Sequence, residues 1–169
     1  MQYHGGDVYR NKDVRLDFSI NTNPLGVPPK VLEAARGAVE LLGRYPDPQQ
    51  EELKKKIADV LVCEPDEVLV GNGASELFLD IVFTFMPKKI GVVTPSFGGY
   101  KYAAEACGAD LIEYPLKEKS GYEIDDGISE MLDSGIDLLF LATPNNPTGR
   151  TIPLPLLERI LKHCQRKNI

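Results

Sequence analysis

The stretch LLFLATPNNPTG, residues 138–149, joins a short apolar run to a turn rich in proline and asparagine. An apolar run of this length, bounded by charge and proline, is typical of a buried strand. The amphipathic segment 155–166 follows the turn and predicts a helix. A strand, a turn and a helix in this order form the repeating unit of an α/β sheet.

The same order extends toward the amino terminus. Strands are predicted at 68–70, 90–94, 111–114 and 138–142, and helices at 75–85, 99–107, 124–132 and 155–166. Because the strands are short, apolar and separated by helices, we expect an α/β fold, a mostly parallel sheet with helices on both faces.

The first part of the chain has a different pattern. Up to residue 27, the glycine, asparagine and proline residues are typical of turns and loops. An apolar stripe at helical spacing then predicts a helix over 31–42. Asp47, with Gln50 in the capping-box position, predicts the start of a second helix. We therefore expect an irregular and helical arm over residues 1–46 and a partial α/β domain over residues 47–169.

Composition limits the classes of function. The formal net charge is −6, which argues against nucleic-acid and anionic-membrane partners. No apolar run reaches the length of about 18 residues that a membrane span needs, and the polar, glycine-rich start is unlike a secretory signal. Three cysteines without Cys-x-x-Cys spacing and two histidines do not favour a metal site. We expect a reduced, cytoplasmic protein.

A glycine-rich turn at 71–76 runs from the predicted strand at 68–70 into a helix. Unpaired N–H groups and the positive end of the helix dipole suit a phosphate there. Gly73 allows close approach and Ser75 can add a donor, although a plain tight connection has the same pattern. Glu76 stands where a dinucleotide fingerprint has its third glycine, so a Rossmann-type nucleotide binder is disfavoured.

Two further loops follow predicted strands. Phe97 or Tyr100 could stack on a flat heterocycle beyond the strand 90–94; core packing is the alternative for both rings and is favoured for Tyr100. In the turn after the strand 138–142, an asparagine amide could be held toward a ring oxygen. Three such loops at the ends of successive strands favour a shared ligand site.

Five motifs carry a family resemblance. In chain order they are Asn-Thr-Asn-Pro-Leu-Gly (21–26), Arg-Tyr-Pro-Asp (44–47), Gly-Asn-Gly-Ala-Ser-Glu (71–76), Pro-Ser-Phe (95–97) and Asn-Asn-Pro-Thr-Gly (145–149). With these motifs the chain resembles the amino-terminal part of the fold-type I pyridoxal-phosphate enzymes, in the histidinol-phosphate aminotransferase branch. The opening residues, 4–9 and 16–19, are more similar to the threonine-phosphate decarboxylases of cobalamin synthesis.

The resemblance implies pyridoxal 5′-phosphate as cofactor. Gly73, Ala74 and Ser75 would then hold its phosphate. Phe97 would stack on its pyridine ring, and Asn146 would hydrogen-bond its phenolic oxygen.

The resemblance also implies a substrate side and a homodimer. Asn23 to Gly26 would line the side of the substrate carboxylate, and His4 could face a phosphate on the amino-acid substrate. Tyr45 would reach the cofactor phosphate of the neighbouring subunit, so that two copies would complete each site.

Residues that the family uses for catalysis are missing. The family places an aspartate under the pyridine nitrogen, a lysine in a Ser-x-x-Lys context and a carboxylate-binding arginine beyond its Asn-Pro-Thr-Gly motif, whereas this chain ends at Ile169. None of its lysines has that context. Without the lysine no covalent link to the cofactor can form, and without the aspartate the ring is a weaker electron sink. We therefore expect no catalytic residue in this chain and no turnover by it alone.

The type of reaction stays open at this point. A decarboxylase would release carbon dioxide from the substrate alpha carbon, and an aminotransferase would remove a proton from it. A different class, a short non-catalytic relative that binds a phosphate ligand or acts as a scaffold, is the alternative.

Overall fold

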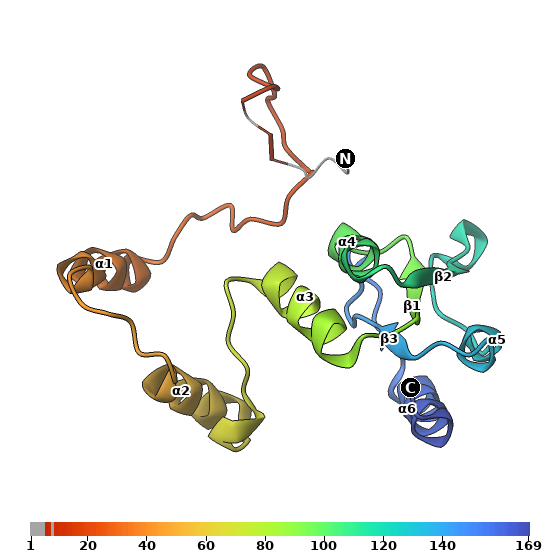
Figure 1. Cartoon of the computed structure of the whole chain (residues 1–169). Coiled ribbons are helices and arrows are strands. Elements are labelled where there is room, and N and C mark those ends of the chain that lie inside the picture. The colour runs from red at the N-terminus through yellow and green to blue at the C-terminus, as the bar shows by residue number, and fades with distance from the viewer. Residues whose placement is uncertain (1–5, 8) are drawn as a thin grey trace. The chain divides into compact units, whose positions relative to one another are not determined.

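The structure is a computed structural model that describes residues 6, 7 and 9–169. Its contacts divide the chain into two compact units, Met1–Pro65 and Asp66–Ile169. Figure 1 labels the elements of both. This division falls later than residue 46, the boundary expected for the α/β domain, because the second helix groups with the first unit.

The first unit contains two α-helices. Helix α1 spans Pro29–Ala38 and continues as a 3-10 turn, η1, over Val39–Leu41. Pro28 precedes α1 and Pro29 is its first residue, as a fixed backbone φ favours. None of the residues of α1 is buried, so its apolar stripe is not covered by the first unit.

Helix α2 spans Glu51–Leu61 and begins later than predicted. The Asp47 carboxylate accepts hydrogen bonds from the backbone N–H groups of Gln49 and Glu51. Gln50 takes a left-handed conformation and forms no side-chain cap. Asp47 therefore accepts from Glu51, the first residue of α2, but the N-cap position predicted for Asp47 belongs to Gln50.

The second unit is built on a parallel three-stranded sheet. Strand β1 spans Lys89–Thr94, β2 spans Asp110–Pro115 and β3 spans Leu138–Phe140, in the order β2-β1-β3. Both neighbours of β1 run parallel to it. The expected α/β class with a parallel sheet is confirmed.

Residues 68–70, predicted as a strand, form no strand in the structure. They precede α3 (Ala74–Phe85) and follow the 3-10 turn η2 (Pro65–Glu67). A strand exists only where a neighbour supplies backbone hydrogen bonds, and none of the three described strands pairs with this segment. The prediction was wrong for this chain because an apolar run does not reveal whether a pairing partner is present.

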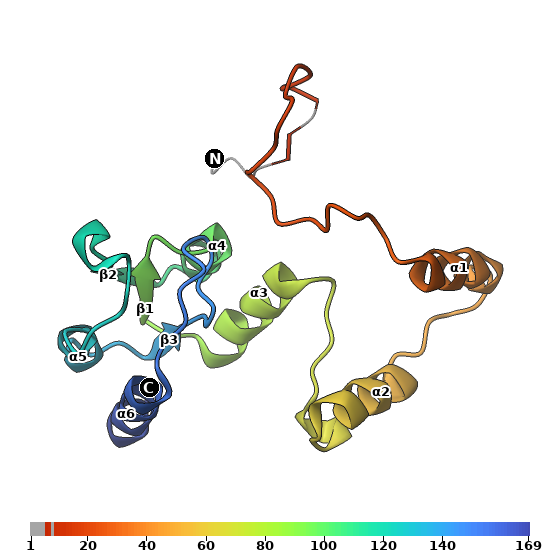
Figure 2. The same cartoon turned by 180° about the vertical axis from the view of Figure 1, so that it is seen from behind.

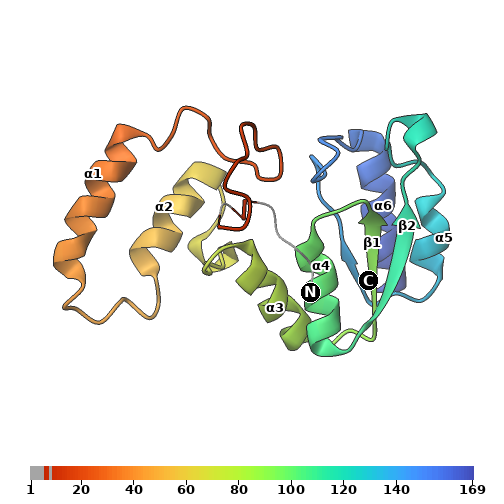
Figure 3. The same ribbon diagram turned by 90° about the horizontal axis from the view of Figure 1, so that it is seen from above.

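Helices cover both faces of the sheet, as expected. Figures 2 and 3 show α3 and α4 (Gly98–Cys107) to one side of the strands and α5 (Ile128–Asp133) and α6 (Leu154–Lys167) to the other. Ile90 and Val92 of β1 pack in the core with α3 and α4. Val93 lies in the second core, with residues of α5 and α6. Alternate side chains of one strand thus support two cores.

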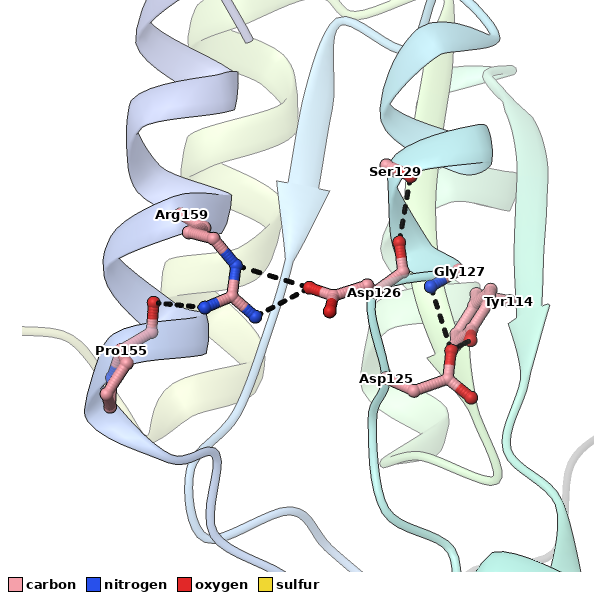
Figure 4. A network of polar contacts seen from close by, with 7 residues as sticks. All are labelled: Tyr114, Asp125, Asp126, Gly127, Ser129, Pro155 and Arg159. Carbon is pink, nitrogen blue, oxygen red and sulfur yellow. Dashed lines mark hydrogen bonds and ion pairs between the residues drawn. The ribbon is translucent and has the colours of Figure 1, made fainter.

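Helix α5 begins at Ile128, later than the predicted 124, because a polar turn precedes it (Figure 4). The Asp125 carboxylate accepts hydrogen bonds from the Tyr114 hydroxyl at 2.5 Å and from the Gly127 N–H at 2.8 Å. Asp126 pairs with Arg159 of α6 at 2.6 Å. These contacts join the start of α5 to β2 and α6. The 3-10 turn η3, Glu118–Ser120, lies between β2 and this turn.

The Tyr114 contact changes the acidity of both partners. Partial burial first, and then the hydrogen bond to Asp125, raise the pKa of Tyr114 to about 12. The same hydrogen bond, followed by that from the Gly127 N–H, lowers the pKa of Asp125. The hydrogen bond between them contributes to both shifts, because it stabilises the neutral phenol that donates and the charged carboxylate that accepts.

Candidate functional site

The loops after β1 and β3 leave the sheet at the same edge. The two strands are parallel neighbours, with Val92 opposite Phe140. Residues 95–97 follow β1 and residues 141–150 follow β3. The carboxyl edge of a parallel sheet is where α/β proteins bind ligands, so the structure brings two of the three predicted loops to a suitable position.

Asn145 connects these two loops. Its side chain is only 5% exposed. The side-chain Nδ2 donates to the Pro95 carbonyl at 3.1 Å and to the Thr148 Oγ1 at 3.0 Å. Its backbone N–H donates to the Arg150 carbonyl at 2.8 Å, which closes the turn. The sequence identified this asparagine as turn chemistry only, since no pattern along the chain tells which loop lies opposite.

Asn146, the predicted ring-oxygen donor, is exposed on the same turn. Asn146 follows directly after Asn145, so the hydrogen bond from Asn145 to Pro95 holds the backbone from which the Asn146 side chain extends. Arg150 extends the connection, because its Nε donates to the Gly121 carbonyl at 2.7 Å in the loop after β2. The loops of all three strands are therefore linked at this edge.

Phe97, the predicted stacking ring, is partly buried at the start of α4. Its centroid lies 6.1 Å from Phe78 and 6.0 Å from Tyr100. Gly99 provides the space, since a Cβ there would stand 2.4 Å from the Phe97 ring. Tyr100 is 8% exposed and stacks on Phe140 at 4.9 Å, which confirms the core role favoured for Tyr100.

The predicted phosphate turn forms the start of α3. Gly73 is the N-cap residue, with φ 84°, and Ala74 and Ser75 are the first two helical residues. All three are exposed. The Gly73 N–H donates to the Gly71 carbonyl at 2.9 Å, so this predicted donor is already engaged. In this turn, the groups that remain to bind a phosphate are the backbone amides of Ala74 and Ser75 and the accessible backbone at Gly73.

Glu76 adds a negative charge to the same turn. Its carboxylate accepts a hydrogen bond from the Asn72 N–H. An acidic side chain stabilises the first turn of a helix, but it also opposes a second anion nearby. In the sequence, Glu76 served only to exclude a dinucleotide fingerprint; its place beside the predicted phosphate donors comes from the structure.

Helix α3 reaches the Phe97 loop through one aromatic contact. Phe78 lies one turn after Ser75, on the same face of α3. Its ring packs against Phe97, and it is also the neighbour that a Cβ on Gly99 would meet at 3.3 Å. The start of α3, the Phe97 loop and the Asn146 turn therefore belong to one connected part of the second unit.

The remaining predicted residues lie elsewhere in the chain. Asn23 to Gly26 forms a turn in which the Gly26 N–H donates to the Asn23 carbonyl at 3.0 Å. Tyr45 is 91% exposed. These residues belong to the first unit, so their role at the site stays a prediction. His4 lies outside the described residues.

The described residues contain no candidate metal site and no candidate membrane-spanning helix. No group of three or more His, Cys, Asp or Glu side chains among them could hold a metal ion. In the same part of the chain, none of the helices has the length and apolar character needed to cross a membrane.

Comparison with known proteins gives consistent matches. The family model described as aminotransferase class I and II matches residues 14–169. The threonine-phosphate decarboxylase of Salmonella typhimurium is 35% identical over 98% of this chain. A histidinol-phosphate aminotransferase of Anaeromyxobacter is 41% identical over 76% of it. The chain spans 48% and 36% of these two proteins, half their length or less.

A solved structure agrees with the sequence matches. The histidinol-phosphate aminotransferase of Sinorhizobium meliloti, in complex with pyridoxal 5′-phosphate, superposes with a TM-score of 0.73 at 25% identity. The superposition covers 86% of this chain and 39% of that protein.

Proposed function

Because this chain belongs to the class I and II aminotransferase family, we propose that it binds pyridoxal 5′-phosphate as the amino-terminal part of an enzyme for phosphorylated amino-acid substrates. The resemblance inferred from five motifs is confirmed at the level of the family. The observation that carries the proposal for this chain is the hydrogen bond from Asn145 to Pro95, which joins the Phe97 and Asn146 loops at one sheet edge.

The residues present fit the cofactor in three respects. Nothing lies within 4 Å of a Cβ built on Gly73, so an anion can approach the backbone there. Ala74 and Ser75 stand in the first turn of a helix, where N–H groups have no partner within the helix. Phe97 offers a ring held in place by Phe78.

Each residue then has a distinct task. The Ala74 and Ser75 amides and the Ser75 hydroxyl bind the phosphate, since charge-assisted hydrogen bonds are the strongest available to a dianion. Phe97 covers one face of the ring and excludes water from it. Asn146 donates a hydrogen bond to the phenolic oxygen. The bound cofactor supplies the electron sink that weakens a bond at the substrate alpha carbon.

Turnover requires more than this chain contains. No lysine in it follows a serine by three positions, so none stands in the family context for a covalent link to the cofactor. We therefore infer that the chain binds cofactor weakly and is inactive alone. In the intact enzyme, Tyr45 reaches the cofactor phosphate of the other subunit of a homodimer; its 91% exposure leaves it available for that contact.

The substrate carries an amino group and a phosphate, and it enters one of two reactions. The relative named threonine-phosphate decarboxylase aligns with 98% of the chain, whereas the histidinol-phosphate aminotransferase aligns with 76%. This difference favours decarboxylation of a phosphorylated threonine over transamination. The resemblance of residues 4–9 and 16–19 to the threonine-phosphate decarboxylases supports the same choice.

Nuclear magnetic resonance tests the binding step directly. Pyridoxal 5′-phosphate added to the isotope-labelled chain should shift the amide signals of Ala74, Ser75, Phe97 and Asn146 with one common dissociation constant. Pyridoxal, which lacks the phosphate, is the matched ligand control and should bind more weakly. Ser75→Ala removes one charge-assisted donor, worth about 1.5–3 kcal/mol in the intact enzyme. Shifts confined to surface lysines would contradict the proposal.

A further inference from the structure

We propose that Asn145 is a positioning residue, whose buried side-chain amide sets the spacing between Phe97 and Asn146 for a flat ring; this inference rests on the proposed function. Pro95 lies two residues before Phe97, and Asn145 lies one residue before Asn146. The 3.1 Å bond from Nδ2 to the Pro95 carbonyl is therefore a short path between the two proposed ring contacts.

The chemistry of Pro95 makes the amide specific. Proline has no N–H, so its backbone can offer only a carbonyl acceptor. The Thr148 Oγ1, the second partner of Nδ2, accepts as well. An asparagine supplies two donors from one nitrogen. An ionised aspartate at the same place would offer only acceptor oxygens to the Pro95 carbonyl, which cannot donate. Burial to 5% exposure leaves little access for water to replace the amide.

The Oδ1 atom of Asn145 argues against a purely stabilising role for this side chain. Among the described residues, none donates to the buried Asn145 Oδ1. A buried acceptor without a donor costs free energy, and a leucine of similar shape would avoid that cost. Stability alone therefore does not account for asparagine here, whereas the need for a donor to Pro95 does.

The turn itself has independent support, so loss of the side chain should act locally. The Gly149 N–H donates to the Asn145 carbonyl at 2.7 Å, and the Asn145 N–H donates to the Arg150 carbonyl at 2.8 Å. The Ile152 N–H donates to the Thr143 hydroxyl at 3.0 Å. All of these bonds join residues of the same loop or its continuation. The bond to Pro95 instead spans the loops of two strands.

The test compares two shape-matched variants of the whole chain. Asn145→Leu removes the donor to Pro95, whereas Thr148→Val removes an acceptor inside the turn, which receives the Asn145 Nδ2 at 3.0 Å and the Arg150 N–H at 3.4 Å. Pyridoxal 5′-phosphate and inorganic phosphate are each titrated against both variants and the unaltered chain, with the amide signals as readout. Thermal melting by circular dichroism records stability in parallel.

We expect Asn145→Leu to weaken binding of pyridoxal 5′-phosphate about ten-fold, equal to about 1.4 kcal/mol. Its affinity for inorganic phosphate and its melting temperature should stay close to those of the unaltered chain, because the start of α3 and the turn are intact. Thr148→Val should bind both ligands like the unaltered chain. A purely structural role would change the melting temperature and both affinities together.

Equal affinity of Asn145→Leu and the unaltered chain for pyridoxal 5′-phosphate would overturn the inference while leaving the proposed function intact. Failure of the unaltered chain to bind that ligand would overturn the proposed function, and this inference with it. If Asn145→Leu does not fold, hydrogen exchange of the Asn145 side-chain amide is measured on the unaltered chain instead. The cofactor should then slow exchange of the Asn145 side-chain amide protons, and unchanged exchange would overturn the inference.

Discussion

The Asn145 side chain donates a 3.1 Å hydrogen bond to the Pro95 carbonyl and so joins the loops that follow β3 and β1. The amino ends of the same strands are joined as well. There the Asp137 carboxylate accepts hydrogen bonds from the N–H groups of Lys88 and Lys89, at 2.7 and 2.9 Å. The strand pair that carries Phe97 and Asn146 is thus held by side chains at both ends.

The contact at Asp137 predicts acid sensitivity. The N–H groups of Lys89 and then Lys88 lower the pKa of Asp137 below its ordinary 3.8. A lowered folded-state pKa stabilises the fold above the unfolded value, and this contribution is lost as pH falls through the folded value. Thermal melts between pH 7 and 3 should show a smaller acid-induced drop for Asp137→Asn than for the unaltered chain. Parallel pH profiles would contradict this.

The raised pKa of Tyr114 predicts a loss of stability at alkaline pH. Its pKa is raised to about 12, chiefly by partial burial and by the hydrogen bond to Asp125. A raised folded-state pKa gives a contribution that is complete below the unfolded value of 10.0 and is lost as pH rises toward 12. Tyr114→Phe cannot ionise, so its melting temperature should fall less over this interval. A nuclear magnetic resonance titration in which the Tyr114 ring signal has its midpoint near 10 would oppose the assignment.

The sequence predicted most of the second unit because β1 is a buried apolar run and because β2 and β3 are short strands between helices. Ile90 and Val92 are almost fully buried in β1, and such positions have a clear pattern. Residues 68–70 have the same pattern without a paired neighbour. The Asn145 bridge and the engaged Gly73 amide depend on contacts between chain segments, or on exact backbone angles, that no local pattern encodes.

Gly99 should be intolerant of a side chain. A Cβ there would meet the Phe97 ring at 2.4 Å and Phe78 at 3.3 Å, so the ring has to move. We expect Gly99→Ala to lower stability by about 1–3 kcal/mol, as overpacking does, and to weaken pyridoxal 5′-phosphate binding. Gly37→Ala in α1 is the matched control, since nothing lies within 4 Å of its Cβ. Urea unfolding of both variants measures the difference.

Self-association is expected from the uncovered surfaces. In the sheet order β2-β1-β3, strands β2 and β3 are each paired on one side only within the described part of the chain. Val31 and Leu42 of the first unit are 53% and 80% exposed. Unpaired edges and apolar surface promote association. Light scattering should show a mass that rises with protein concentration and with added sulfate; a monomer at all concentrations would contradict this.

The proposed arrangement places Ser75, Phe97 and Asn146 around one cofactor. A crystal structure of this chain soaked with pyridoxal 5′-phosphate measures it most directly. We expect the phosphate within hydrogen-bond distance of the Ala74 and Ser75 amides, with the ring against Phe97 and its phenolic oxygen near the Asn146 amide. A cofactor bound only at surface lysines, or with its ring away from both loops, would contradict the account.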